Sequence, residues 1–242
     1  MYIIYIMSKY NIPFIVHQTF YTTSLPIQIV KIINHNKKLC PNYKFYFYDD
    51  EACEEFIKKN FEERVYNAYM KLNKYYGAMK ADFFRYCVLY KLGGIYLDIK
   101  SKINKPLGLI IKANDVCVLD KLRNYLEPWR RNNPTYEQWL LMFAPNHPYL
   151  NEMINQMVSN IENNYQPRIE GYIKLTSKQK VLILTGPDAF TRAINTYIKK
   201  NNKIEHRTID YNNYFQRHNG GYMNMYKNKR HYSEVNAPLY NS

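Results

Sequence analysis

Five polar residues on either side of a Gly-Gly pair have types and spacing that could bind a ligand. They are Asp82, Arg85, Tyr96, Asp98 and Lys100. Asp82 and Arg85 are three positions apart, so in a helix their side chains share a face. Tyr96, Asp98 and Lys100 alternate with period two, so in a strand they point to the same side. A carboxylate near the end of an apolar strand is costly to bury without a partner.

Two interpretations of Asp98 follow from its place in the sequence. In open α/β sheets, ligands bind beyond the carboxyl ends of the strands, and Asp98 comes near the end of the apolar run IYLDI. The alternative is a structural ion pair of Asp98 with Arg85 or Lys100. The positions alone leave both open.

The chain around these residues has the pattern of a parallel sheet with crossover helices. A helix is predicted at 78–92, because apolar residues recur at helical spacing, and Gly93-Gly94 ends it. Asp49-Asp50 is placed to cap a helix. The opening order of strand, helix, strand, helix indicates an α/β fold. The expected strands are 12–19, 43–48, 95–99, 116–119, 140–143 and 181–185, and the other expected helices are 27–36, 51–60, 148–163 and 189–199.

Composition limits the class of protein. The 242 residues carry a formal net charge of +14, which suggests nucleic acid or another polyanion as a partner. An AT-rich genome, whose codons favour Lys, Asn, Tyr and Ile, is the competing explanation. The aromatic residues follow strand and helix spacing and no nucleic-acid-reading motif is present, so nucleic acid is not an expected partner.

Two further features indicate where the protein works. No window has the roughly 18 consecutive apolar residues of a membrane span, so a soluble protein without a transmembrane segment is expected. The four cysteines form no C-x-x-C pair, and their spacing fits neither a disulfide framework nor a zinc site. We expect buried, reduced thiols and a cytoplasmic location. These cysteines are Cys40, Cys53, Cys87 and Cys117.

The run ADFFRYCVLYKLGGIYLDIKS (81–101) resembles the core motif of the DxD sugar-binding glycosyltransferases of family 32, which include mannosyltransferases. IPFIVHQ (12–18) resembles the opening strand of that family. APNHPYLNEMI (144–154) and LTGPDAFTRAI (184–194) are similar to its later segments. These segments occur in the family's order over about four-fifths of the chain. The AT-rich composition and compact length would suit a large DNA virus or an AT-rich bacterium.

The resemblance implies a fold and an activity. The fold is the GT-A type, a Rossmann-like α/β domain with a mixed, mainly parallel sheet flanked by helices. A single domain would cover 1–242, with 201–242 as a closing segment. The implied activity is a retaining transfer of a hexose-type sugar from a UDP- or GDP-linked donor to a glycan, protein or lipid. A nucleotide-sugar-binding pseudoenzyme is the alternative.

The resemblance also assigns roles to particular positions. Asp82 and Arg85 fall on the residues that contact the ribose or sugar of the donor, and Tyr96 falls close to the donor phosphates. The opening strand would lie beside the nucleobase, with His17 and Gln18 nearest the site. The implied donor-binding set is Ile15, Val16, His17, Gln18, Asp82, Arg85, Tyr96 and Asp98, and the implied catalytic set is Asp98, Lys100 and Arg85.

One departure from the family pattern concerns a metal. The second aspartate of D-x-D usually ligates Mn²⁺ or Mg²⁺, and here that position is Lys100. An ammonium group cannot ligate a hard cation, which prefers oxygen donors. Lys100 could replace the charge of the metal. Alternatively, Asp98 holds a metal with help from the C-terminal segment, where His231 is a candidate ligand. In the third case the protein binds a nucleotide sugar without turning it over.

Overall fold

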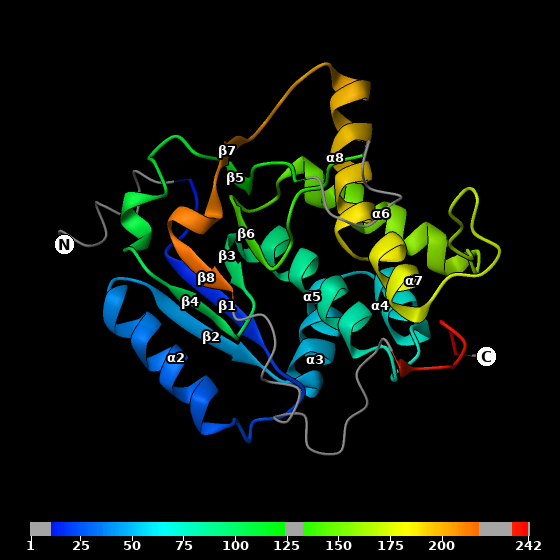
Figure 1. The fold of residues 1–242 in the computed structure, drawn as a ribbon, viewed down its shortest axis with the longest axis horizontal. Coiled ribbons are helices and arrows are strands. Elements are labelled where there is room, and N and C mark those ends of the chain that lie inside the picture. Colours follow the sequence, from blue (N-terminus) through cyan, green and yellow to red (C-terminus); the bar gives the residue numbers. More distant parts are fainter. Residues whose placement is uncertain (1–10, 124–132, 218–233, 242) are drawn as a thin grey trace.

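Residues 11–123, 133–217 and 234–241 are described by the computed structural model, which forms one central sheet flanked by helices (Figure 1). The strand order in the sheet is β2-β1-β3-β6-β5-β7. Among these six strands only β6 runs antiparallel to its neighbours, so the sheet is mixed and mainly parallel, as predicted. The strands are β1 (Ile15–Thr19), β2 (Lys44–Tyr48), β3 (Gly94–Leu97), β5 (Cys117–Asp120), β6 (Leu140–Phe143) and β7 (Arg207–Ile209), and a separate antiparallel pair joins β4 (Ser101–Ile103) to β8 (Phe215–Arg217).

The two faces of the sheet pack into separate hydrophobic cores. Tyr96 of β3 belongs to the core that the helices α5, α6 and α8 complete. Ile95 and Leu97 point the other way, into a core with Trp139 and Tyr211. Successive residues of a strand point to opposite faces, so both faces of β3 are buried and only its ends can reach a ligand.

The helices follow the predicted order. Asp49 caps α3 by accepting a hydrogen bond from the backbone N–H of Ala52 (2.9 Å), as its position in the sequence predicted. Helix α4 was not predicted. The helices are α2 (Ile27–Leu39), α3 (Asp50–Asn60), α4 (Glu63–Lys71), α5 (Gly77–Leu92), α6 (Pro148–Glu162), α7 (Ser177–Leu184) and α8 (Pro187–Asn201), and short 3₁₀ turns cover Leu107–Leu109 and Tyr211–Asn213.

The predicted strand at 181–185 is wrong, because these residues end helix α7. Thr176 accepts a hydrogen bond from the backbone N–H of Gln179, and the Gln179 side chain accepts one from the backbone N–H of Thr176. This reciprocal capping box fixes the start of a helix. A run of four apolar residues such as VLIL fits a buried helix as well as a strand, so the pattern alone could not distinguish them.

The polar chain after residue 201 contributes to the fold in three places. Strand β7 pairs with β5, and β8 pairs with β4. Residues 234–241 return to the segment after α4, where Leu239 O accepts a hydrogen bond from the backbone N–H of Asn73 (2.9 Å). The closing role of 201–242 stays a prediction, and residues 218–233 of that segment lie outside the described residues. Among the described helices, none has the length and apolar character needed to cross a bilayer.

Candidate active site

A Gly-Gly turn places β3 directly after the helix that carries Asp82 and Arg85. Gly93 and Gly94 have φ values of +62° and +93°, which side chains rarely adopt. A Cβ on Gly94 would stand 2.6 Å from the backbone oxygen of Ile15 in β1, and one on Gly93 would stand 2.7 Å from Pro145. Glycine is therefore required at both positions. The turn fixes how the end of β3 meets α5.

Helix α5 is buried on nearly all sides, so its polar face is also internal. Asp82 and Arg85 are both buried, in contrast to a helix with one apolar stripe and one solvated face. Their expected common face is confirmed by an ion pair between Arg85 Nη2 and Asp82 Oδ1 at 3.0 Å. Buried charges of this kind require partners, and the surrounding elements supply them.

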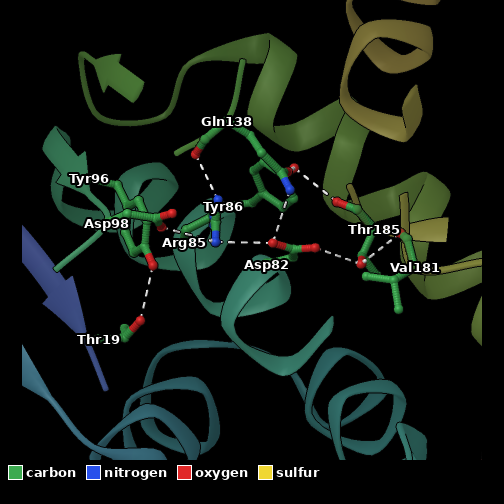
Figure 2. A network of polar contacts seen from close by, with 9 residues as sticks. All are labelled: Thr19, Asp82, Arg85, Tyr86, Tyr96, Asp98, Gln138, Val181 and Thr185. Atoms are coloured by element: carbon green, nitrogen blue, oxygen red, sulfur yellow. Dashed lines mark hydrogen bonds and ion pairs between the residues drawn. The ribbon is translucent and has the colours of Figure 1, made fainter. Parts of the chain in front are cut away.

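Three groups hold the Asp82 carboxylate (Figure 2). Thr185 Oγ1 donates to Asp82 Oδ2 at 2.8 Å, Gln138 Nε2 donates to Oδ1 at 3.1 Å, and Arg85 is the third partner. Burial raises the pKa of Asp82 to about 6, and the charge of Arg85 and the hydrogen bond from Thr185 act in the opposite direction. The carboxyl group is therefore more basic than an ordinary aspartate.

Arg85 lies at the centre of the network, between Asp82 and Asp98 (Figure 2). Its Nη1 donates to the backbone oxygen of Gln138 at 2.7 Å, and its Nη2 is 3.5 Å from Asp98 Oδ1. The guanidinium group lies over the ring of Tyr96, 4.5 Å from the centroid. Within the described part of the chain, nothing accepts a hydrogen bond from its buried Nε. A buried donor without a partner is destabilising and indicates a group that a ligand oxygen could satisfy.

Asp98 is the most accessible carboxylate of this network. Its side chain is 28% exposed, whereas that of Asp82 is 4% exposed. Strand β3 ends at Leu97, and the backbone N–H of Ser101 donates to Asp98 O at 2.8 Å in the turn that follows. The predicted strand 95–99 is therefore too long. Asp98 and Lys100 belong to a turn, and the expected strand alternation does not extend to them.

The structure brings together Asp82, Arg85, Tyr96 and Asp98 from α5 and the end of β3. Half-buried Lys100 lies two residues further along, in the turn. The hydroxyl groups of Tyr96 and Thr19 are hydrogen-bonded at 2.9 Å, which links this group to the end of β1. These positions fit either interpretation of Asp98, since the Arg85 ion pair exists and one side of the carboxylate remains accessible.

The side chains of strand β1 that are expected to lie beside a nucleobase are largely buried in the protein. His17 is fully buried, with Nδ1 hydrogen-bonded to Tyr48 Oη at 3.2 Å and Nε2 to the backbone oxygen of Gly93 at 3.0 Å. Burial lowers the pKa of His17 to about 4, so the ring is neutral. Gln18 is buried and its Nε2 donates to Leu97 O at 3.4 Å. Val16 lies in the core and Ile15 is half-buried. Contact of these four residues with a nucleobase stays a prediction.

Sequence reasoning missed Gln138 and Thr185. The Tyr86 hydroxyl lies within hydrogen-bond distance of Gln138 Oε1 and, at 2.9 Å, of Thr185 O. Gln138 comes just before β6, and because β6 is antiparallel to β3, its start lies at the carboxyl edge of β3. That placement follows from the topology of the sheet and has no local sequence signal.

The described residues do not by themselves form a metal centre. Among them, no group of three or more His, Cys, Asp or Glu side chains is arranged to hold a metal ion. Asp98 pairs with the cationic Arg85. His231, the candidate second ligand, lies outside the described residues.

The sequence matches a known protein family and several curated relatives. Residues 26–117 match the model of the glycosyltransferase sugar-binding region containing the DXD motif. The chain is 28% identical to an uncharacterized glycosyltransferase of Acanthamoeba polyphaga mimivirus over 82% of this chain and 71% of the relative. It is 31% identical to inositol phosphoceramide mannosyltransferase 3 of Schizosaccharomyces pombe over 64% of this chain and 39% of the relative. An initiation-specific alpha-1,6-mannosyltransferase of Candida albicans is 26% identical, with 65% of this chain and 45% of the relative covered. The chain thus spans less than half of these two fungal relatives.

Solved structures share the fold. The PaToxG glycosyltransferase superimposes with a TM-score of 0.56 at 20% identity, covering 82% of this chain and 78% of that one. The UDP-bound glycosyltransferase domain of the YGT toxin gives a TM-score of 0.52 at 9% identity, covering 81% and 79%. These likenesses show a GT-A fold. Together with the match over residues 26–117 and the curated relatives, they support a glycosyltransferase that is similar to those containing the DXD sugar-binding region.

Proposed function

We propose that this glycosyltransferase moves a hexose-type sugar from a UDP- or GDP-linked donor to a carbohydrate-bearing acceptor on a glycan, protein or lipid, with retention of anomeric configuration. The observation that carries the proposal is the Asp82–Arg85–Asp98 arrangement at the carboxyl end of β3. In sheets of this type ligands bind at that edge. The fungal relatives named as mannosyltransferases and the UDP-bound neighbour support the donor class.

The network offers complementary groups for a sugar nucleotide. The carboxylate of Asp98, partly exposed, can accept hydrogen bonds from ribose or sugar hydroxyls, and Nε of Arg85 can donate to a ligand oxygen. Tyr96 and Asp82 hold the guanidinium group in place from two sides. Because the binding groups are held by the protein before the donor arrives, little side-chain entropy is lost on binding.

The chemistry requires positive charge near the leaving diphosphate. The bond between C1 and the diphosphate oxygen breaks through an oxocarbenium-like transition state. The acceptor oxygen bonds to C1 on the same face, and its proton passes to the departing phosphate. Negative charge grows on the phosphate, so we assign its stabilisation to the ammonium group of Lys100 and the guanidinium group of Arg85. This route needs no nucleophile from the protein.

We assign no step to Mn²⁺ or Mg²⁺, because the described residues supply Asp98 as the accessible carboxylate of the network and pair it with the guanidinium group of Arg85. A cytoplasmic location remains part of the proposal. It is supported by the four cysteines, which are all buried and free of disulfides.

Donor binding and turnover test the function. Purified protein is screened by thermal shift with UDP, GDP and their sugar conjugates, each with Mn²⁺ and with EDTA. A ligand at about 100 times its Kd stabilises by roughly 2.7 kcal/mol, which is about 5–10 °C for a domain of this size. Release of the nucleotide from the donor then measures turnover. Absence of any shift or turnover in folded protein would contradict the proposal.

Asp98→Asn and Arg85→Ala test the site. In both variants the rate of donor turnover is expected to fall by about a hundred-fold or more, because each removes a group placed at the reacting diphosphate or sugar. The matched controls are Glu162→Gln and Arg64→Ala, which break an exposed ion pair remote in sequence from the site. Circular dichroism and thermal unfolding establish that the variants are folded. Full turnover in folded Asp98→Asn or Arg85→Ala would overturn the site assignment.

A further inference from the structure

The connection between α6 and α7, residues 163–176, carries an exposed apolar side chain, Ile173, at its tip. Ile173 at the tip is fully exposed, and Tyr165 and Tyr172 are each exposed by about two-fifths. Single exposed apolar residues are ordinary on a protein surface, but Ile173 is exposed completely and stands directly between Tyr172, also partly exposed, and the basic residue Lys174. In Figure 1 this loop, coloured yellow-green, projects from the side of the molecule next to α7.

The tip is held out from the protein by a firm base. Pro167 and Leu175 on its two sides are buried, and the capping box of Thr176 anchors the start of α7. Between them, the backbone N–H of Tyr172 donates to Ile169 O at 3.1 Å and closes a turn. Gly171 in this turn has φ +79°, and a Cβ placed there would meet nothing within 4 Å. The exposure of Ile173 is therefore a property of an ordered loop.

Basic residues occur along the loop and in the first turn of α7. The segment 163–180 contains four basic residues and a single acidic one, Glu170. One of these basic residues, Lys174, is exposed and follows Ile173 directly. Aromatic and aliphatic groups flanked by Lys and Arg are the combination that favours the headgroup region of a membrane with anionic lipids. The four basic residues are Arg168, Lys174, Lys178 and Lys180.

We propose that the α6–α7 loop docks on the surface of a bilayer containing anionic lipids. Ile173 would insert at the boundary between the headgroups and the acyl chains, and the basic residues would lie at the headgroups. The charge of the loop complements the lipid, and the apolar tip distinguishes a bilayer from a soluble polyanion. Membrane binding of this kind is peripheral and reversible. It is independent of the transferase activity proposed above.

Docking at this loop would also place the active site near the membrane. Helix α7 begins at the base of the loop and leads to Thr185, whose hydroxyl holds Asp82. Eight helical residues span about 12 Å, so the base of the loop and Thr185 are separated by the length of one short helix.

The test is vesicle co-sedimentation of the full chain. Vesicles of phosphatidylcholine alone are compared with vesicles that contain about one-third phosphatidylserine. Wild-type protein is expected to bind the anionic vesicles far more strongly than the neutral ones. Ile173→Ser is expected to weaken that binding about ten-fold, because one large aliphatic side chain no longer leaves water. Lys174→Glu is expected to weaken it by a similar factor, since it reverses a charge at the membrane surface.

The matched control is Ile204→Ser. Ile204 is also exposed, at 67%, but lies in the segment between α8 and β7 on another side of the fold (Figure 1). It is expected to bind like the wild type. Ile173→Trp provides a second readout, because a tryptophan entering the bilayer shifts its fluorescence emission to the blue on adding anionic vesicles.

Three results would overturn the proposal. They are no preference of the wild type for anionic vesicles, equal losses in Ile173→Ser and Ile204→Ser, and losses confined to Lys174→Glu. The last would identify a general polyanion surface, which RNA would then occupy as well as lipid. Donor turnover in solution is unaffected by Ile173→Ser, so failure of membrane docking is distinguishable from failure of the transferase assignment.

Discussion

The hydrogen bond from Thr185 to Asp82 gives a sharp test of the buried network. Thr185→Val keeps the shape of the side chain and removes the hydroxyl that donates to Asp82 Oδ2 at 2.8 Å. The carboxylate stays buried and loses a donor. A hydrogen bond to a charged group contributes about 2 kcal/mol, and one to a neutral group about 1 kcal/mol. The loss in the free energy of unfolding therefore depends on whether Asp82 is ionised.

The pKa of Asp82 gives the sign of this pH dependence. It is raised to about 6 from an ordinary value of 3.8, so the folded protein holds a proton on Asp82 more tightly than the unfolded chain. On its own, this group contributes stability that is present below pH 3.8 and is lost as pH rises through 6. The bond from Thr185 acts on the ionised form, so its contribution grows as the pH rises through the same window. Thr185→Val should cost about 2 kcal/mol near pH 8 and about 1 kcal/mol near pH 4.5.

Urea unfolding of the wild type, Thr185→Val and Thr185→Ser at the two pH values measures this difference. Thr185→Ser keeps the hydroxyl, so it reports the cost of removing a methyl group and should show no added loss at high pH. Donor turnover should fall in Thr185→Val with the rise in the pKa of Asp82, and the acid limb of its pH profile should move upward. An equal loss at both pH values for Thr185→Val would refute the reasoning, because the hydroxyl would then not act on a titrating carboxylate.

Two further predictions concern Lys100 and Gly94. If Lys100 neutralises the leaving diphosphate, wild-type turnover persists in EDTA, whereas Lys100→Met loses on the order of a hundred-fold and Lys100→Asp recovers turnover only with Mn²⁺. Equal EDTA sensitivity of the wild type and Lys100→Asp would contradict this role. Gly94→Ala should destabilise by about 2 kcal/mol or more in urea unfolding, because of its φ of +93° and the backbone of Ile15 at 2.6 Å. The control Gly108→Ala, whose Cβ meets nothing within 4 Å, should change stability by less than about 1 kcal/mol.

The parts of the site that sequence predicted are those with local signals. The spacing of Asp82 and Arg85 within one helix predicted their common face. The Gly-Gly pair predicted where the helix ends and the next strand begins. Their depth was not predicted. Whether a polar helical face meets solvent or the interior depends on elements far along the chain, and Gln138 reaches Asp82 only because β6 starts beside the end of β3.

The error at 181–185 shows how a wrong element would have misplaced a site residue. Read as a strand, VLILT would hydrogen-bond in the sheet and end with Thr185 at its edge. As the end of α7, the same residues turn the chain at Thr185, whose backbone N–H donates to Val181 O at 3.0 Å while its side chain reaches Asp82. The deciding signal was the polar pair Thr176 and Gln179, which lie five and two residues before Val181, and not the apolar run itself. A capping box specifies where a helix begins, whereas a short apolar run specifies only burial. Polar residues that start an element thus determined where this buried carboxylate finds its hydroxyl partner.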